Sequence, residues 1–118
     1  MSKIGNLKSK TVNGRDVYSG SICTLEHSII ITMRPISGKA SDNAPSHEIS
    51  TMNKDGIETE IGAAWEKQFS RGTNPGEKFF SITIDDPSFN RPLNVAAFKN
   101  GQTGDWDIMY RRRQDRAA

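Results

Sequence analysis

Short apolar runs, each bounded by turn-forming residues, follow one another along the whole chain. The sequence has ten glycines and five prolines, and Asn13-Gly14 and Asp55-Gly56 are strong signals for tight turns. This spacing favours strands over helices. We predict an all-β fold, an antiparallel meander of about seven or eight strands forming a sandwich or a partly open barrel. The expected strands cover residues 3–12, 15–25, 28–36, 46–52, 57–69, 78–85, 93–100 and 105–113.

One of these runs, residues 57–69, is ambiguous by propensity. Its alanine, glutamate, lysine and glutamine residues favour a helix. The alternation from Ile57 through Ile61 to Trp65 has period two instead, and Gly62 disfavours a helix. We therefore predict a strand, and we expect Trp65 and Trp106 to belong to the core. Inward positions are also expected at Phe80, Ile82 and Ile84, and one face of the last strand should carry Trp106, Ile108 and Tyr110.

The length of 118 residues suits a single domain. We expect residues 1–110 to form one β domain and residues 111–118 to form a basic C-terminal tail. No apolar run approaches the roughly 20 residues of a membrane span, and the first fifteen residues lack the apolar segment of a signal peptide. Cys23 is the single cysteine, so no internal disulfide can form. We expect a cytoplasmic protein with no membrane partner.

Basic residues are concentrated at the two ends of the chain. Residues 1–15 carry a charge of +4, residues 111–118 carry +3 and the remainder carries −5, which gives the total of +2. A protein that coats duplex DNA is usually more basic throughout. The basic ends therefore indicate either a nucleic-acid site confined to the ends or a solubilising tail.

In the nucleic-acid interpretation, cations neutralise phosphates while an aromatic ring stacks on a base. Tyr110 directly precedes three arginines, which is the best local case for such a surface. The candidate residues are Lys8, Lys10, Arg15, Tyr110, Arg111, Arg112 and Arg113. The other strand aromatics belong either to the core or to a base-stacking surface: Tyr18, Trp65, Phe79, Phe98 and Trp106.

The sequence shows no catalytic or metal-binding arrangement. Asp85 and Asp86 are adjacent, but neighbouring strand residues point to opposite faces, so the two carboxylates diverge. Asp86 precedes a proline, which predicts a turn. Cys23, His27 and His47 lack the spacing of a zinc site or a nucleophile–base pair. We expect no enzyme, no cofactor, no metal and no small-molecule substrate.

An ordered set of short motifs gives the chain a family resemblance. "YSGSICTL", "SDNAP", "IGAAWEK", "FFSITIDDPSF" and "PLNVAAF" resemble the bacterial family catalogued as domain of unknown function 736, over nearly the whole chain. The chain departs from the family pattern at Ser46-His47, where an aspartate and an aromatic are expected, and at Glu66, where a basic residue is expected. The resemblance implies small proteins of conjugative plasmids and integrative elements, encoded near transfer and anti-restriction genes. It implies no catalytic residue.

Two functions follow from these observations as expectations. The first is a non-enzymatic binding protein of a mobile genetic element, associated with nucleic acid through its basic ends. The alternative is an inhibitor of a host defence complex, of anti-restriction or anti-CRISPR type, whose acidic surface occupies a basic protein channel. The residues of that surface would be Asp55, Glu58, Glu60, Glu66 and Glu77, and the acidic middle of the chain also includes Asp42 and Glu48. The oligomeric state is left open.

Overall fold

The structure is a computed structural model that describes residues 2–25, 27–38, 43–68 and 77–110. Its described part consists of eight antiparallel strands, each hydrogen-bonded to its neighbours in the sequence. The first and last strands also pair, which closes the sheet into a barrel. The strands are β1 (Ser2–Val12), β2 (Arg15–Cys23), β3 (Ser28–Pro35), β4 (His47–Met52), β5 (Glu58–Gln68), β6 (Lys78–Ile84), β7 (Leu93–Lys99) and β8 (Trp106–Tyr110).

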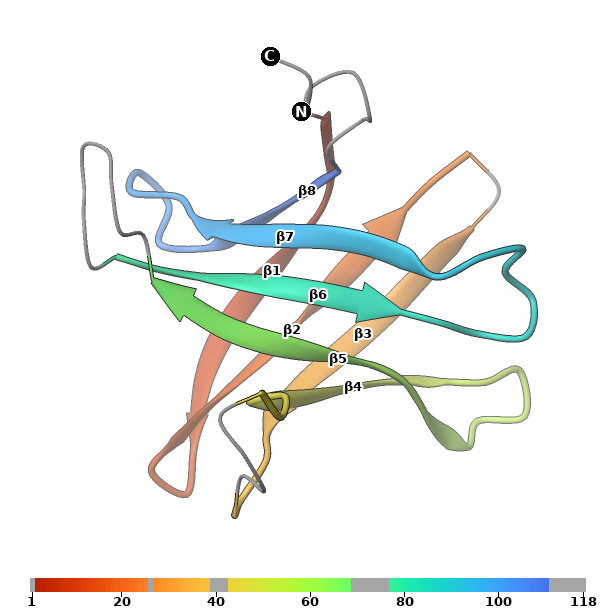
Figure 1. Cartoon of the computed structure of the whole chain (residues 1–118), viewed down its shortest axis with the longest axis horizontal. Coiled ribbons are helices and arrows are strands. Elements are labelled where there is room, and N and C mark those ends of the chain that lie inside the picture. Colours follow the sequence, from red (N-terminus) through yellow and green to blue (C-terminus); the bar gives the residue numbers. More distant parts are fainter. Residues whose placement is uncertain (1, 26, 39–42, 69–76, 111–118) are drawn as a thin grey trace.

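The predicted all-β meander is confirmed, and the choice between a sandwich and a partly open barrel resolves to a closed barrel. Figure 1 shows β1, β2 and β3 crossing obliquely behind β5, β6 and β7. Residues 57–69, which were ambiguous by propensity, contain β5 and not a helix. Within the described residues, no helix is long and apolar enough to cross a membrane. The predicted tail, residues 111–118, lies outside the described residues.

The interior of the barrel is filled by apolar side chains. Phe80, Ile82 and Ile84 point inward as predicted, each at most 1% exposed. An aromatic cluster lies inside the barrel, toward the end at which a turn joins β1 to β2. There the ring of Phe80 contacts the rings of Tyr18, His47 and Trp106 at centroid distances of 5.2, 5.1 and 4.9 Å. A barrel of eight strands is just wide enough for side chains to fill it. With its interior filled by side chains, the barrel presents its outer surface to other molecules.

A β-bulge in β5 overturns the prediction that Trp65 belongs to the core. Ser50 pairs with Glu60, but the preceding residue Ile49 pairs with Gly62, so Ile61 is an extra residue. One extra residue exchanges the inward and outward sides of the strand that follows it. Ile61 and Ala64 are buried, while Trp65 turns to the outer face and is half-buried. Trp106 is 5% exposed and belongs to the core, as predicted.

The Asp85-Asp86 pair forms a turn, as predicted. A carboxylate oxygen of Asp86 accepts hydrogen bonds from the backbone N–H of Ser88 at 2.9 Å and from its hydroxyl. These hydrogen bonds lower the pKa of Asp86, because they favour its charged form. The turn positions Phe89, whose ring lies 4.8 Å from that of His27 and packs against the core.

Candidate nucleic-acid interface

The hairpin of β1 and β2 extends beyond the barrel wall. Pairing of β1 with β8 runs from Ser2 to Leu7, and pairing of β2 with β3 runs from Tyr18 to Cys23. Residues 8–17, which we call the arm, lie beyond the pairing with β8 and β3. They form a two-stranded ribbon held by the pairing of β1 with β2. Asn13 and Gly14 both have positive φ and close it with the tight turn that the sequence predicted. Figure 1 shows the arm, in red to orange, at the lower left.

Three predicted phosphate-binding residues lie on one face of the arm. Leu7 and Tyr18 are buried inside the barrel, so Lys8, Lys10 and Arg15 belong to the outer face by strand alternation. All three are exposed. Arg15 donates one hydrogen bond to the Ser37 hydroxyl at 2.5 Å, which leaves most of its five N–H groups for other partners. The result is a cationic face on a ribbon.

The acidic residue of the arm lies on its opposite face. Asp16 alternates with Arg15 and accepts a hydrogen bond from the Thr11 hydroxyl at 3.0 Å. The cations and the carboxylate are therefore separated by the thickness of the ribbon. An approaching polyanion meets positive charge on the outer face, which is what phosphate binding requires.

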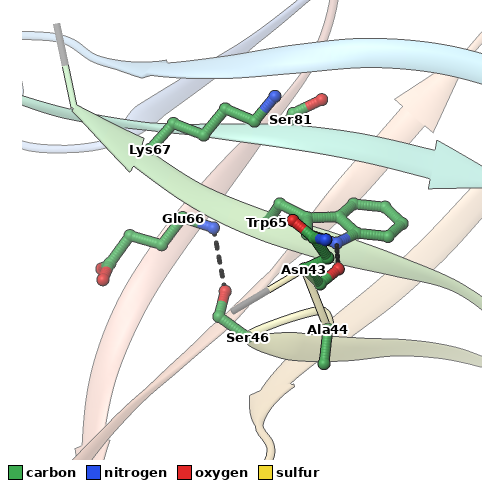
Figure 2. Close-up of a pocket in the computed structure, with 7 residues that line it drawn as sticks. All are labelled: Asn43, Ala44, Ser46, Trp65, Glu66, Lys67 and Ser81. Carbon is green, nitrogen blue, oxygen red and sulfur yellow. Dashed lines mark hydrogen bonds between the residues drawn. The ribbon is translucent and has the colours of Figure 1, made fainter. Parts of the chain in front are cut away.

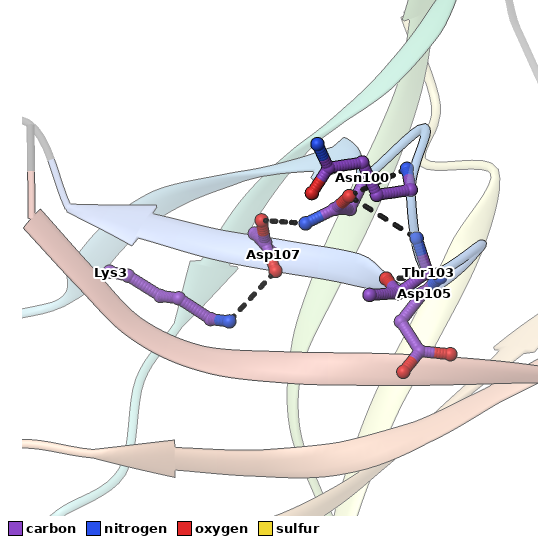
Figure 3. Close-up of polar contacts among 6 residues, drawn as sticks. Lys3, Asn100, Thr103, Asp105 and Asp107 are labelled. Carbon is purple, nitrogen blue, oxygen red and sulfur yellow. Dashed lines mark hydrogen bonds and ion pairs between the residues drawn. The ribbon is translucent and has the colours of Figure 1, made fainter.

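The fourth cation of the N-terminal segment is already paired. The ammonium group of Lys3 lies 3.0 Å from a carboxylate oxygen of Asp107, and Asn100 donates to the other oxygen at 3.2 Å (Figure 3). Asn100 also accepts from the backbone N–H of Gln102, so this network fixes the β7–β8 turn beside the start of β1. Lys3 thus forms an ion pair, whereas Lys8, Lys10 and Arg15 form none among the described residues.

Tyr110, the predicted base-stacking residue, does not lie beside the arm. Tyr110 is 36% exposed and pairs with Ser2, at the end of β1 opposite the arm. About ten residues of β1, or roughly 30 Å, separate the two ends. Arg111, Arg112 and Arg113 lie outside the described residues. The structure therefore does not join Tyr110 and the arm into one continuous surface.

A groove of about 450 Å³ lies on the outer face of β5 and β6, next to the segment that leads into β4. Figure 2 shows Trp65 beside Asn43, with the indole N–H donating to the Asn43 carbonyl oxygen at 3.0 Å. Ser81 is the cross-strand neighbour of Trp65, and Lys67 lies two residues further along the same outer face of β5. The groove is lined by Asn43, Ala44, Ser46, Trp65, Glu66, Lys67 and Ser81.

Further aromatic rings lie beside this groove on the outer surface. Phe79 and Phe98 stack with centroids 5.6 Å apart, and Phe79 pairs with Lys67 across the strands. Both phenylalanines are half-buried. Of the aromatics that the sequence left undecided, Tyr18 and Trp106 are therefore core residues, whereas Trp65, Phe79 and Phe98 share the outer face of β5, β6 and β7. The sequence did not predict the groove, because the groove depends on the β-bulge at Ile61 and no sequence pattern indicates that bulge.

The predicted acidic surface is divided. Glu58 pairs with Arg34 at 2.5 Å, and Glu66 pairs with Lys78 at 3.3 Å at the other end of β5. Asp55, Glu60 and Glu77 are exposed, but Glu77 directly precedes β6 while Asp55 lies in the β4–β5 turn. Asp55, Glu58 and Glu60 thus lie together at the turn end of the β4–β5 hairpin, away from Glu66 and Glu77.

Exposed apolar residues surround this acidic hairpin. Ile30, Met52 and Ile57 are 74%, 63% and 61% exposed. A second groove, of about 350 Å³, is lined by Ile30, Met52 and Glu58 among others. Large exposed apolar residues at the edge of a groove are typical of protein-binding surfaces.

Ser46 and His47 form a Ser–His contact with a structural role. Ser46 Oγ lies 2.8 Å from His47 Nδ1, but it also accepts from the Glu66 backbone N–H at 2.9 Å. His47 is 8% exposed and packs inside the barrel. Cys23 lies at the other end of the barrel, where its thiol shares a hydrogen bond with the Ser28 hydroxyl at 3.4 Å. Among the described residues, no group of three metal-ligating side chains is found.

Burial of His47 makes the stability of the barrel pH-dependent. Desolvation lowers the pKa of His47, partly opposed by the nearby Glu66 carboxylate. Below the unfolded-state pKa of about 6.5, the unfolded chain binds more protons, so the free energy of unfolding should fall as the pH drops from about 6.5. Urea titrations at a series of pH values measure this. His47→Phe should remove this dependence, and an unchanged dependence would contradict it.

Comparison with protein-family models matches residues 3–113 to the family described as "Protein of unknown function (DUF736)". No curated protein matches the chain, and no solved structure matches it.

Proposed function

This chain belongs to the DUF736 family, and because the family description assigns no activity, we propose a function from the chain's own surfaces: a non-enzymatic protein that binds duplex DNA through its arm. The observation that carries the proposal is the position of Lys8, Lys10 and Arg15 on one face of a projecting two-stranded ribbon. The major groove of B-DNA admits a two-stranded β-ribbon. The three cations then contact the flanking phosphates.

The genetic setting expected from the family resemblance supports this proposal by association. Proteins encoded on conjugative plasmids and integrative elements work beside the DNA of those elements. A ribbon with three cations gives a modest, salt-sensitive affinity, because phosphate contacts supply most of non-specific binding. The proposed activity is therefore accessory DNA binding within the cell, without chemistry on the DNA.

The test is the salt dependence of binding to a duplex. Replacing Lys8, Lys10 and Arg15 together with glutamine should reduce the slope of log K against log salt by about 2.7, because each lost phosphate contact accounts for roughly 0.9. Fluorescence anisotropy with a labelled duplex, at four or more salt concentrations, measures the slope. Wild-type affinity should also fall steeply as salt increases.

The matched control removes the same charge elsewhere. Lys54, Arg91 and Lys99 are exposed and lie outside the arm, so changing all three to glutamine lowers the net charge equally. This control should leave the slope nearly unchanged. Equal losses in both triple variants would mean that overall charge, and not the arm, binds DNA, and the proposal would be wrong. The same measurement on a chain that ends at Tyr110 gives the contribution of residues 111–118 to the slope separately.

A second candidate function is inhibition of a host defence protein, as the acidic residues suggested. The observation that favours it is the β4–β5 hairpin, where Asp55 and Glu60 lie close in sequence to the exposed Met52 and Ile57. Such a surface suits a partner with basic and apolar residues. Binding to that partner would survive nuclease and would be unaffected by the arm substitutions, which separates the two functions.

A further inference from the structure

We infer that the groove beside Trp65 binds an unpaired nucleobase of a single-stranded nucleic acid. The inference rests on the proposed function for the class of ligand and adds a second site, on a different face of the barrel. The arm contacts phosphates, whereas the groove would hold a base.

The bulge places on the outer face an indole ring that a regular strand would bury inside the barrel. In a regular strand without the bulge, the period-two pattern would put Trp65 on the same inner face as Ile61. Burying an indole stabilises a core, so an outward tryptophan gives up stability that the fold could have gained. Bulges are frequent next to functional sites, where they redirect a side chain.

The outward indole is held in one position. Its N–H donates to the Asn43 carbonyl oxygen at 3.0 Å, which ties β5 to the segment preceding β4. Ser46, in the same segment, accepts from the Glu66 backbone N–H, and its own N–H donates to the Ala64 carbonyl oxygen at 2.9 Å. A pre-positioned aromatic ring binds a flat ligand with less loss of entropy than a mobile ring does.

The polar groups around Trp65 suit a nucleotide. The Asn43 amide and the Ser81 hydroxyl can donate and accept hydrogen bonds at a base edge. Lys67 is exposed on the same outer face as Trp65 and can contact a phosphate. Among the described lining residues, the carboxylate is that of Glu66, which pairs with Lys78, and this pairing reduces its repulsion of a phosphate. Single-strand-binding proteins combine aromatic stacking with cations in this way.

The size and surroundings of the groove agree with this ligand. Its volume of about 450 Å³ lies within the range of small-ligand sites. Beyond Lys67, the stacked pair of Phe79 and Phe98 extends the aromatic surface across β6 and β7. Nucleic-acid-binding sheets display aromatic residues on neighbouring strands in a similar manner.

The experiment compares a strand with bases and a strand without them. An oligothymidylate of about 12 nucleotides and an abasic strand of the same length carry the same phosphates, so their difference reports base contacts. Wild type should bind the oligothymidylate more tightly, and Trp65→Leu should lose about 5- to 150-fold of affinity for it, the range of one stacking contact. Affinity for the abasic strand and for duplex should stay constant. Trp65→Phe keeps a ring and should retain most of the preference.

The outcomes separate this inference from the proposed function. If wild type shows no preference for the strand with bases, or if Trp65→Leu keeps that preference while unfolding cooperatively, the inference is wrong. If duplex binding still depends on the arm in that case, the proposed function stands alone. If the preference depends on Trp65 but duplex binding does not depend on the arm, the groove stands and the proposed function fails. Absence of binding to both nucleic acids overturns both.

Discussion

Phe80→Ala is expected to lower the free energy of unfolding by about 3–5 kcal/mol, as measured by urea unfolding followed by circular dichroism. Phe80 is fully buried, and its ring contacts those of Tyr18, His47 and Trp106. These partners come from β2, β4 and β8, so one cavity would loosen contacts on several sides of the barrel. Because single domains have about 5–15 kcal/mol of stability, the loss would be a large fraction of the total.

Phe79→Ala is the matched control, since it makes the same substitution one residue earlier in β6. Phe79 is half-buried on the outer face, where removal of the ring leaves no enclosed cavity. Its loss of stability should be clearly smaller than that of Phe80→Ala. Equal losses would mean that β6 does not present Phe80 inward and Phe79 outward, and the assignment of the two faces would be wrong.

Gly20→Ala is expected to lower the free energy of unfolding by about 3 kcal/mol or more, the upper end of the usual cost of adding atoms to a packed core. A Cβ atom at this position would lie 1.8 Å from the Asn6 carbonyl oxygen and 2.9 Å from the Leu7 Cα atom. Both are backbone atoms of β1, so the two strands would have to separate. Glycines allow sharp bends where a barrel closes. Thermal and urea unfolding of the variant measure the effect.

Gly101→Ala is the control for this prediction. Gly101 lies in the β7–β8 turn, and an added Cβ would meet no atom within 4 Å. Its effect should be within about 0.5 kcal/mol, the usual range for surface changes. If Gly20→Ala were equally mild, the close approach of β1 and β2 at Asn6 would not exist in solution.

The barrel has a filled interior, so its function depends on its outer surface. Small eight-stranded barrels can enclose a ligand, but here Phe80, Leu7 and Ile108 are fully buried in the centre. Recognition then depends on what the outer faces display. The described surface carries the cationic arm, the groove beside Trp65, and the β4–β5 hairpin with its acidic and apolar residues. Each of these suits a ligand of different chemistry.

Part of the candidate site was predictable from local sequence. Asn13-Gly14 predicted the turn of the arm, and alternation along β1 placed Lys8 and Lys10 on one face. What the sequence could not indicate was that this hairpin extends beyond its neighbours, because that depends on where β8 and β3 stop pairing. The separation of Tyr110 from the arm depends on the register of β1 against β8, because this register pairs Tyr110 with Ser2 at the far end of β1.

The sequence by itself determined the elements of this protein. Its turn signals and period-two alternation predicted about seven or eight strands, and the described residues form eight. They also predicted the inward residues Phe80, Ile82 and Ile84 and the turn at Asp86, because these features depend on residues close in the chain. Tertiary structure decided barrel closure and the position of Trp65. Both depend on cross-strand register: β1 pairs with β8, and the extra residue Ile61 turns Trp65 outward, because side chains alternate with period two and one added residue exchanges the faces.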